Sequence, residues 1–276
     1  MKTAVIISTY NAPRVLRLCL YGFVAQKDAD FEIIIADDGS DDRTKQALAH
    51  PDFDVLRDRN HLKHVWHEDT GFRLSAIRNL AINSTDADYL IFIDGDCIPR
   101  DDYVASHQKQ ARPGYFMAGG RIDIPEAVHE NFQPEEITSN RVFDIENLIQ
   151  KDASLAKYRN RLSRNNVTRS ILNILTWRYC VFAGSNSAAW RKDLFMVNGF
   201  DESFPGYGSE DRDIGIRMRN AGIKSRYQKF SFCQLHLSHP RKYFDPAVND
   251  RNRKVFRERR RDGTTAVAHG LKEMEI

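Results

Sequence analysis

The chain has 276 residues, of which 29% are charged and 41% are hydrophobic, and its formal net charge at pH 7 is +3. This composition is typical of a globular protein with one large α/β domain or two small ones and argues against long disorder, and the net charge is too small to identify a nucleic-acid binder. Because the apolar run after Met1 and Lys2 is short and no apolar segment approaches roughly 18 residues, we expect a cytoplasmic protein without a signal peptide or membrane span.

Two apolar runs near the N-terminus, residues 4–8 and 31–36, predict strands that are buried on both faces. Asn11 is predicted to cap the helix that follows the first run. Strand, helix and strand make a βαβ unit, whose parallel strands carry their loops at the same edge of the sheet. We therefore expect residues 8–11 and 37–40 to lie side by side.

The segment after these strands contains a weakly indicated third strand near Val65 and then a helix entered through residues 71–79. Arg73 and Arg78 lie at the start of this helix. Guanidinium groups bind phosphate oxygens well, so these arginines are candidates for a diphosphate site. Solvated arginines on the flank of a helix are the alternative.

Residues 89–96 form the centre of the prediction, because an apolar run ends abruptly in Asp94-Gly95-Asp96. In an extended chain, residues i and i+2 point to the same side, so both carboxylates face one ligand. Two adjacent carboxylates repel each other unless a cation or donor groups lie nearby. The stretch predicts a buried strand with a divalent metal site that an anionic substrate completes. An ordinary strand-to-turn boundary is the alternative.

A predicted helix over residues 102–110 and a strand over 115–118 lead into residues 121–183, which contain no glycine. Apolar residues at helical spacing and scattered basic residues indicate a helical excursion from the sheet. This excursion forms either a wall or lid on the acceptor side, or a purely structural helical pair.

The last third of the chain predicts a helix that begins at Glu210 and Asp211 and is followed by a C-terminal Gly222 cap. Carboxylates at a helix N-terminus are favoured by the helix dipole, so capping is the alternative to a catalytic role. A strand over residues 226–235 is predicted to end just before two histidines, His236 and His239. The basic tail predicts either a solvated helix or contact with an anionic membrane surface.

Five motifs occur in one order along the chain. They are Ser8-Thr9-Tyr10-Asn11, Asp37-Asp38-Gly39-Ser40, residues 73–79, Asp94-Gly95-Asp96, and the run from Gly199-Phe200-Asp201 to Gly208-Ser209-Glu210-Asp211. Together they resemble the family 2 glycosyltransferases of the GT-A fold, in the branch whose C-terminal half is similar to β-1,4-galactosyltransferases and to bacterial chondroitin polymerase. The resemblance covers about residues 1–120 and 180–245.

The resemblance implies an α/β fold with a single Rossmann-like sheet, mixed but mainly parallel, flanked by helices. The GT-A domain would span residues 1–245, with a nucleotide-binding half (1–120), the helical excursion (121–183) and an acceptor and catalytic half (184–245). A basic helical tail would follow over residues 246–276.

The resemblance also implies roles for individual residues. The nucleotide would be bound by Ser8, Tyr10 and Asp38 beside Arg73 and Arg78, and Asp94 would reach the ribose or the metal. Asp96 would ligate Mn²⁺ or Mg²⁺ with His236 or alternatively His239. Asp211 would be the general base, and Glu210 would bind the acceptor sugar. Relatives usually carry a tryptophan before the glycines that precede Glu210. Here Tyr207 takes that place and is the candidate for sugar stacking.

The leading hypothesis is therefore an inverting, metal-dependent glycosyltransferase. It would move galactose, glucose or an N-acetylated hexosamine from a UDP-sugar to a glycan or glycolipid acceptor in bacterial surface polysaccharide or lipopolysaccharide assembly, on the cytoplasmic face of the inner membrane. A nucleotidyltransferase is an alternative, but it requires a glycine-rich basic loop that residues 11–14 do not supply. A non-catalytic nucleotide-sugar binder is the other alternative, and no nucleic-acid partner is expected.

Overall fold

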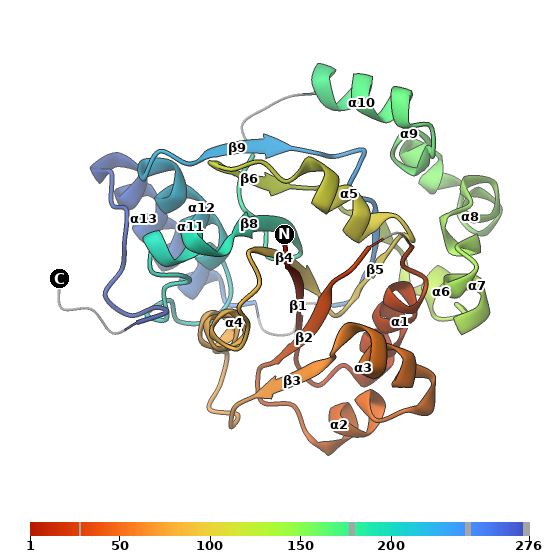
Figure 1. The fold of residues 1–276 in the computed structure, drawn as a ribbon, viewed down its shortest axis with the longest axis horizontal. Helices are drawn as coiled ribbons and strands as arrows, with labels where there is room; N and C mark the ends of the chain where they lie inside the picture. Colours follow the sequence, from red (N-terminus) through yellow and green to blue (C-terminus); the bar gives the residue numbers. More distant parts are fainter. Residues whose placement is uncertain (28, 177–179, 241–243, 273–276) are drawn as a thin grey trace.

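The computed structural model describes residues 1–27, 29–176, 180–240 and 244–272. A seven-stranded sheet with the order β3-β2-β1-β4-β8-β6-β9 runs through the molecule, with helices on both faces (Figure 1). Its strands are β1 (Thr3–Thr9), β2 (Glu32–Asp37), β3 (Lys63–Trp66), β4 (Tyr89–Asp94), β6 (Tyr115–Ala118), β8 (Asn186–Trp190) and β9 (Lys224–Tyr227). Only β8 runs antiparallel to its neighbours, so the mixed, mainly parallel α/β sheet is confirmed.

The central strands are buried on both faces, which explains their continuous apolar sequences. In β1, Val5 and Ile7 belong to one hydrophobic core and Ala4 and Ile6 belong to the other. The first core includes helix α1 (Pro13–Val24), and the second includes α4 (Leu74–Asn83) and α12 (Glu210–Asn220). The remaining helices of the two halves are α2 (Asp42–Leu48), η1 (Pro51–Phe53), α3 (Asp54–Asn60), α5 (Tyr103–Gln110) and α11 (Arg191–Met196).

The loops after β1 and β2 lie side by side, as predicted. The Asn11 amide donates to Ser40 Oγ (2.8 Å), and Asn11 Oδ1 accepts from the Asp41 amide (3.0 Å). The prediction that Asn11 caps α1 is wrong, because Ala12 holds the cap position and Asn11 adopts a left-handed backbone with φ 44°. The Asn11 side chain joins the two loops instead of capping its own helix.

A second, smaller sheet has the order β5-β10-β7 and consists of β5 (Cys97–Pro99), β10 (Gln234–Leu237) and β7 (Ile122–Ile124). The prediction of one strand over residues 226–235 is wrong. The chain leaves the large sheet after β9 and makes a turn in which the Ser231 amide donates to the Gln228 carbonyl (3.1 Å). It then enters the second sheet as β10. This turn brings the histidines that follow to the Asp96 loop, where the Leu237 amide donates to the Asp96 carbonyl (2.9 Å).

After β7 the chain forms short helices at the right and top of Figure 1, of which α7 (Pro134–Thr138) packs against α1. Their inward residues, including Val128, Ile137 and Leu148, belong to the same core as α1. These helices are α6 (Glu126–His129), α7 (Pro134–Thr138), η2 (Arg141–Phe143), α8 (Ile145–Lys151), η3 (Ala153–Tyr158), α9 (Arg159–Leu162) and α10 (Asn166–Leu175).

The basic tail forms helix α13 (Pro246–Asp262), which lies beside α12 (Figure 1). Its Arg259 donates to the buried carboxylates of Asp213 (2.8 Å) and Asp201, so this basic side chain is part of the packing between helices. In the part of the chain that the structure describes, no helix combines the length and the apolar character that crossing a bilayer requires.

Candidate active site

A carboxylate and two imidazoles come together beside the ends of β4 and β10. Asp96 follows β4, and its Oδ2 lies 2.9 Å from His239 Nε2 and 3.5 Å from His236 Nε2. One ligand atom from each of the three residues lies within 4.8 Å of the other two. The structure thus places both candidate histidines, and not one of them, against the same carboxylate oxygen.

The surroundings favour the charged form of Asp96. Burial pushes the pKa of Asp96 upward, but hydrogen bonds from His236 and His239 outweigh burial and hold the pKa below its ordinary value. His236 is buried, and its Nδ1 lies 3.0 Å from Asp123 Oδ1 on β7. This distance is that of an ion pair without hydrogen-bond geometry, so Asp123 places a negative charge beside His236 while Nε2 faces Asp96. The sequence analysis missed Asp123, since only the pairing of β7 with β10 brings it near.

Asp94, at the end of β4, lies beside a buried arginine. Arg78 on α4 is 2% exposed, and its guanidinium reaches Asp94 Oδ1 (3.2 Å) and Ser8 Oγ (3.1 Å). Burial raises the pKa of Asp94 to about 6; Arg78 opposes this rise, whereas the charges of Asp96 and Asp211 add to it. Ser8, Arg78 and Asp94 therefore form one contact set, and Arg73 is not part of it.

Helix α12 presents two carboxylates to this set from its first turn. Asp211 Oδ2 accepts from the Gly184 amide (3.0 Å), and Glu210 Oε2 accepts from the Gly208 amide (2.9 Å). Burial, reinforced by the charge of Asp211, raises the pKa of Glu210 to about 7. A residue in the left-handed region starts this helix, since Ser209 has φ 71°. Glu210 is buried and Asp211 is partly buried, and both are held by backbone amides at the start of the helix.

The candidate nucleotide residues line the loops after β1 and β2. Asp38 is buried, and its oxygens lie 2.8 Å from His67 Nε2 and 3.0 Å from the Arg73 amide nitrogen. Tyr10 is half exposed and donates to Asp69 (2.8 Å). The sequence analysis missed His67, because a histidine in a polar loop carries no periodic signal.

The Arg73 side chain is exposed, and it donates to Thr70 Oγ1 (3.2 Å). Its proximity to Asp38 comes from its backbone, so the structure joins Arg73 to the nucleotide loops and Arg78 to the acidic cluster. The two arginines proposed for the diphosphate thus have different partners.

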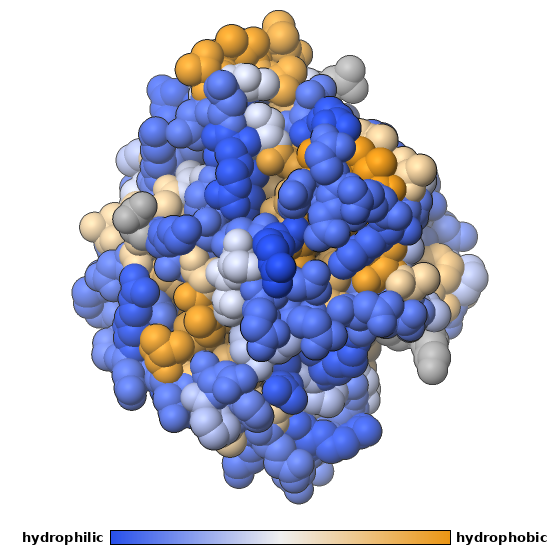
Figure 2. Space-filling view, turned by 90° about the vertical axis from the view of Figure 1, so that its right-hand side faces the viewer, coloured by the Kyte–Doolittle hydropathy of each residue, from blue (hydrophilic) through white to orange (hydrophobic). Residues whose placement is uncertain are grey.

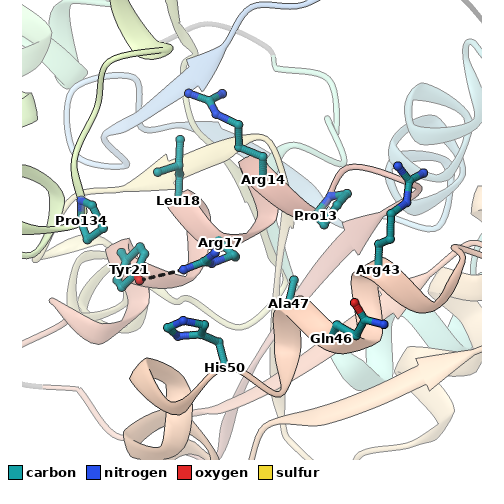
Figure 3. A pocket seen from close by; sticks show the side chains of 10 residues that line it. All are labelled: Pro13, Arg14, Arg17, Leu18, Tyr21, Arg43, Gln46, Ala47, His50 and Pro134. Carbon is teal, nitrogen blue, oxygen red and sulfur yellow. Dashed lines mark hydrogen bonds between the residues drawn. The ribbon is translucent and has the colours of Figure 1, made fainter.

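A separate basic groove lies between α1 and α2 (Figure 3). Arg14, Arg17 and Arg43 line it together with Tyr21 and His50, and Arg17 reaches the Tyr21 hydroxyl (3.5 Å). None of the predicted site residues lines this groove. The candidate active site is therefore the edge of the sheet where β1, β2 and β4 end.

Solved structures with a similar arrangement of strands and helices define the fold. One is the mannosyltransferase PcManGT from Pyrobaculum calidifontis, determined in complex with GDP-Man and Mn²⁺, with a TM-score of 0.58, 17% identity, and coverage of 87% of this chain and 58% of that chain. Another is S. aureus TarS 1-349 in complex with UDP-GlcNAc, with a TM-score of 0.56, 15% identity, and coverage of 88% and 60%. The fold is that of the GT-A glycosyltransferases.

Family models identify the chain more closely. The model described as glycosyl transferase family 2 matches residues 4–172, and the model described as N-terminal domain of galactosyltransferase matches residues 174–240. Since the first match covers more than half of the sequence, the chain belongs to glycosyl transferase family 2.

Two relatives are 28% and 32% identical to this chain over the residues that align. Chondroitin synthase from Escherichia coli is 28% identical over 238 residues, which are 81% of this chain and 33% of that protein. Validoxylamine A glucosyltransferase from Streptomyces hygroscopicus subsp. jinggangensis is 32% identical over 237 residues, which are 80% of this chain and 52% of that protein. The chain thus spans between a third and about half of the length of these relatives.

Proposed function

We propose that this protein is an inverting, metal-dependent glycosyltransferase that moves a sugar from a UDP-sugar to a hydroxyl of a glycan or glycolipid acceptor. The observation that carries the proposal is the convergence of Asp96, His236 and His239 next to the carboxylates that open α12. UDP-GlcNAc in the TarS complex and the chondroitin synthase relative support the choice of donor and acceptor class. We place the reaction in bacterial surface polysaccharide assembly at the cytoplasmic face of the inner membrane.

The residues present fit a divalent transition metal, which Asp96, His236 and His239 would hold. Magnesium prefers oxygen ligands, so two imidazoles favour a metal such as manganese. The PcManGT complex with Mn²⁺ supports the same choice. When bound, the ion supplies a positive charge that stabilises a departing diphosphate.

The loops after β1 and β2 would hold the nucleotide. Asp38 is engaged by His67 and Arg73, yet a carboxylate accepts about four hydrogen bonds, so it keeps capacity for the imide of a uracil. Ser8 and Tyr10 would flank the base. Arg78 would hold Asp94 in place beneath the ribose and supply a fixed cation near the phosphates.

The start of α12 would act on the acceptor. Asp211 is oriented through one oxygen, Oδ2, which accepts from the Gly184 amide. Its other oxygen is proposed to take the proton of the attacking hydroxyl, a contribution of about 10²–10⁴-fold in rate. Glu210 would accept a hydrogen bond from the acceptor sugar. Attack from the face opposite the diphosphate would invert the anomeric centre, so an α-linked donor would give a β-linked product.

The test is a panel of UDP-sugars, with GDP-mannose for comparison, assayed for hydrolysis and transfer with and without manganese. We expect one UDP-sugar to be turned over only with the metal. Asp96→Ala should abolish both activities, whereas Asp211→Asn should abolish transfer and leave UDP binding nearly intact. Asp58→Asn, at an exposed carboxylate on α3, is the matched control. Full transfer by the Asp211→Asn protein would refute the assignment of Asp211 as the base. Turnover without manganese would refute the proposed metal dependence.

A further inference from the structure

Helix α10 is oriented with its apolar side outward. Val167, Ile171, Ile174 and Leu175 are 68%, 51%, 62% and 74% exposed. Figure 2 shows hydrophobic residues gathered at the top of the molecule, where Figure 1 places α10. A helix on the surface of a globular protein normally turns such a stripe toward the core. The orientation of α10 is the reverse of that rule.

Buried hydrogen bonds fix this orientation. Arg169 is 5% exposed and donates to the Phe230 carbonyl (3.0 Å), the Ser231 carbonyl (2.8 Å) and Asp102 Oδ2 (2.7 Å). Asn173 is 6% exposed, donates to Ser231 Oγ (2.8 Å) and accepts from the Phe230 amide (3.0 Å). Rolling the helix inward would strip a buried cation of its partners, so the apolar side stays outside.

The chain leading to this face is basic. Residues 153–176 contain Lys157, Arg159, Arg161, Arg164 and Arg169 and no aspartate or glutamate. Arg159 and Arg164 face carboxylates from outside this segment. Within the described ranges, no carboxylate lies at ion-pair distance from Lys157 or Arg161, whose cations lie over the Tyr158 ring. Two cations that face no carboxylate at this distance thus lie in the segment that leads into α10, where Arg161 donates to the Arg121 carbonyl (2.7 Å).

We propose that the outer face of α10 binds an anionic lipid surface, with its four apolar side chains at the acyl boundary and the basic residues of 157–164 at the headgroups. Apolar burial combined with a basic patch supplies the two signals that interfacial attachment needs. A stable protein interface buries about 800 Å² of surface on each partner, which is more than the outer face of this ten-residue helix offers. Binding to a bilayer requires no such minimum area. This inference does not depend on the proposed glycosyl transfer.

The experiment is co-sedimentation of the full chain with vesicles of phosphatidylcholine alone and of phosphatidylcholine mixed with phosphatidylglycerol. We expect binding to the anionic vesicles that salt weakens. The variant Ile171→Ser, Ile174→Ser, Leu175→Ser should lose about tenfold or more in partitioning. The double variant Val55→Ser, Met196→Ser removes exposed apolar side chains elsewhere, 44% and 57% exposed, and should bind like the wild type. Unchanged melting temperatures show that both variants fold.

The charge component has its own variant. Lys157→Gln, Arg161→Gln should weaken binding to anionic vesicles and leave any binding to neutral vesicles unchanged. A parallel variant on α13, Arg253→Gln, Lys254→Gln, Arg257→Gln, tests whether the exposed side of that helix contributes instead. Loss of binding in the α13 variant alone would overturn the assignment to α10.

Three further results would overturn the proposal. The first is equal partitioning of the wild type and the triple-serine variant. The second is a wild type that stays in the supernatant with anionic vesicles. The third is self-association in sedimentation velocity that the serine changes abolish while vesicle binding is absent, because a second copy of the chain would then cover α10.

Discussion

The contact between Arg259 and two buried aspartates makes a sharp prediction about the C-terminal helix. Asp201 and Asp213 are 2% and 0% exposed, and Arg259 donates to both. Removing one partner of a buried ion pair costs about 3–5 kcal/mol, because the remaining charge stays buried. Asp213 still has an ion pair with Arg217 (2.7 Å) when Arg259 is removed. We therefore expect Arg259→Ala to lower the free energy of unfolding by about 3 kcal/mol, the lower end of that range.

Urea unfolding measures this cost, with Arg257→Ala as the control. Arg257 is exposed on the same helix, so its loss should change the free energy of unfolding by no more than about 0.5 kcal/mol. Burial raises the pKa of Asp201, but Ser203 and Arg259 outweigh burial and lower it overall. A carboxyl with a lowered folded pKa stabilises the fold above its unfolded pKa of about 3.8 and loses that effect as the pH falls.

The difference between the wild type and Arg259→Ala should therefore be largest at neutral pH and shrink in acid. Equal unfolding midpoints for the Arg259→Ala and Arg257→Ala proteins would refute the reasoning. The same contacts explain why deleting the basic tail is a poor test of membrane attachment, since the deletion would expose two buried carboxylates.

Three further predictions concern the site. Because burial raises the pKa of Glu210 to about 7, the wild type should lose stability as the pH rises from about 4.5 through 7. Glu210→Gln should show a smaller loss, since the raised pKa of Asp94 still contributes, and melting temperatures across that range measure the difference. In Gly184→Ala the new methyl group would overlap the Arg78 guanidinium, so UDP affinity measured by calorimetry should fall about tenfold. His236→Gln and His239→Gln should each weaken manganese binding by about tenfold or more, measured by calorimetry without any donor.

Each of these predictions has a control or an outcome that contradicts it. Parallel pH profiles for Glu210→Gln and the wild type would show that this carboxyl does not titrate near neutrality. Ser185→Ala, next to Gly184, should keep UDP affinity, and equal losses in both would point to loop damage. His61→Asn changes an exposed histidine at a left-handed position that asparagine tolerates, and it should bind manganese like the wild type.

The sequence predicts the central strands well because burial on both faces leaves an unbroken apolar run. β1, β2 and β4 carry this signal, and β6 was predicted over its full extent. β8 carries none, because Asn186-Ser187-Ala188-Ala189 contains small and polar residues that only the antiparallel pairing with β4 turns into a strand. Strand β10 was merged with β9, since no pattern shows that consecutive strands belong to different sheets.

The site could be predicted in part for the same reason. Asp94 and Asp96 come at the end of an apolar strand, the α12 carboxylates open a helix, and the structure brings them together. His67 contacts Asp38, and Asp123 lies beside His236, from positions that only tertiary pairing defines. For α10, the periodicity of Ile171 and Leu175 predicts a helix but does not show which side faces the core. The hydrogen bonds of Arg169 decide that.

The anchoring of α10 has a mechanical consequence. Arg169 and Asn173 form hydrogen bonds with the backbone of Phe230 and Ser231. His236 follows Ser231 by only five residues. A displacement of α10 would thus move Phe230 and Ser231, and through the peptide units that follow it would shift the His236 imidazole. Attachment of α10 to a surface would therefore restrict the motion of the His236 imidazole.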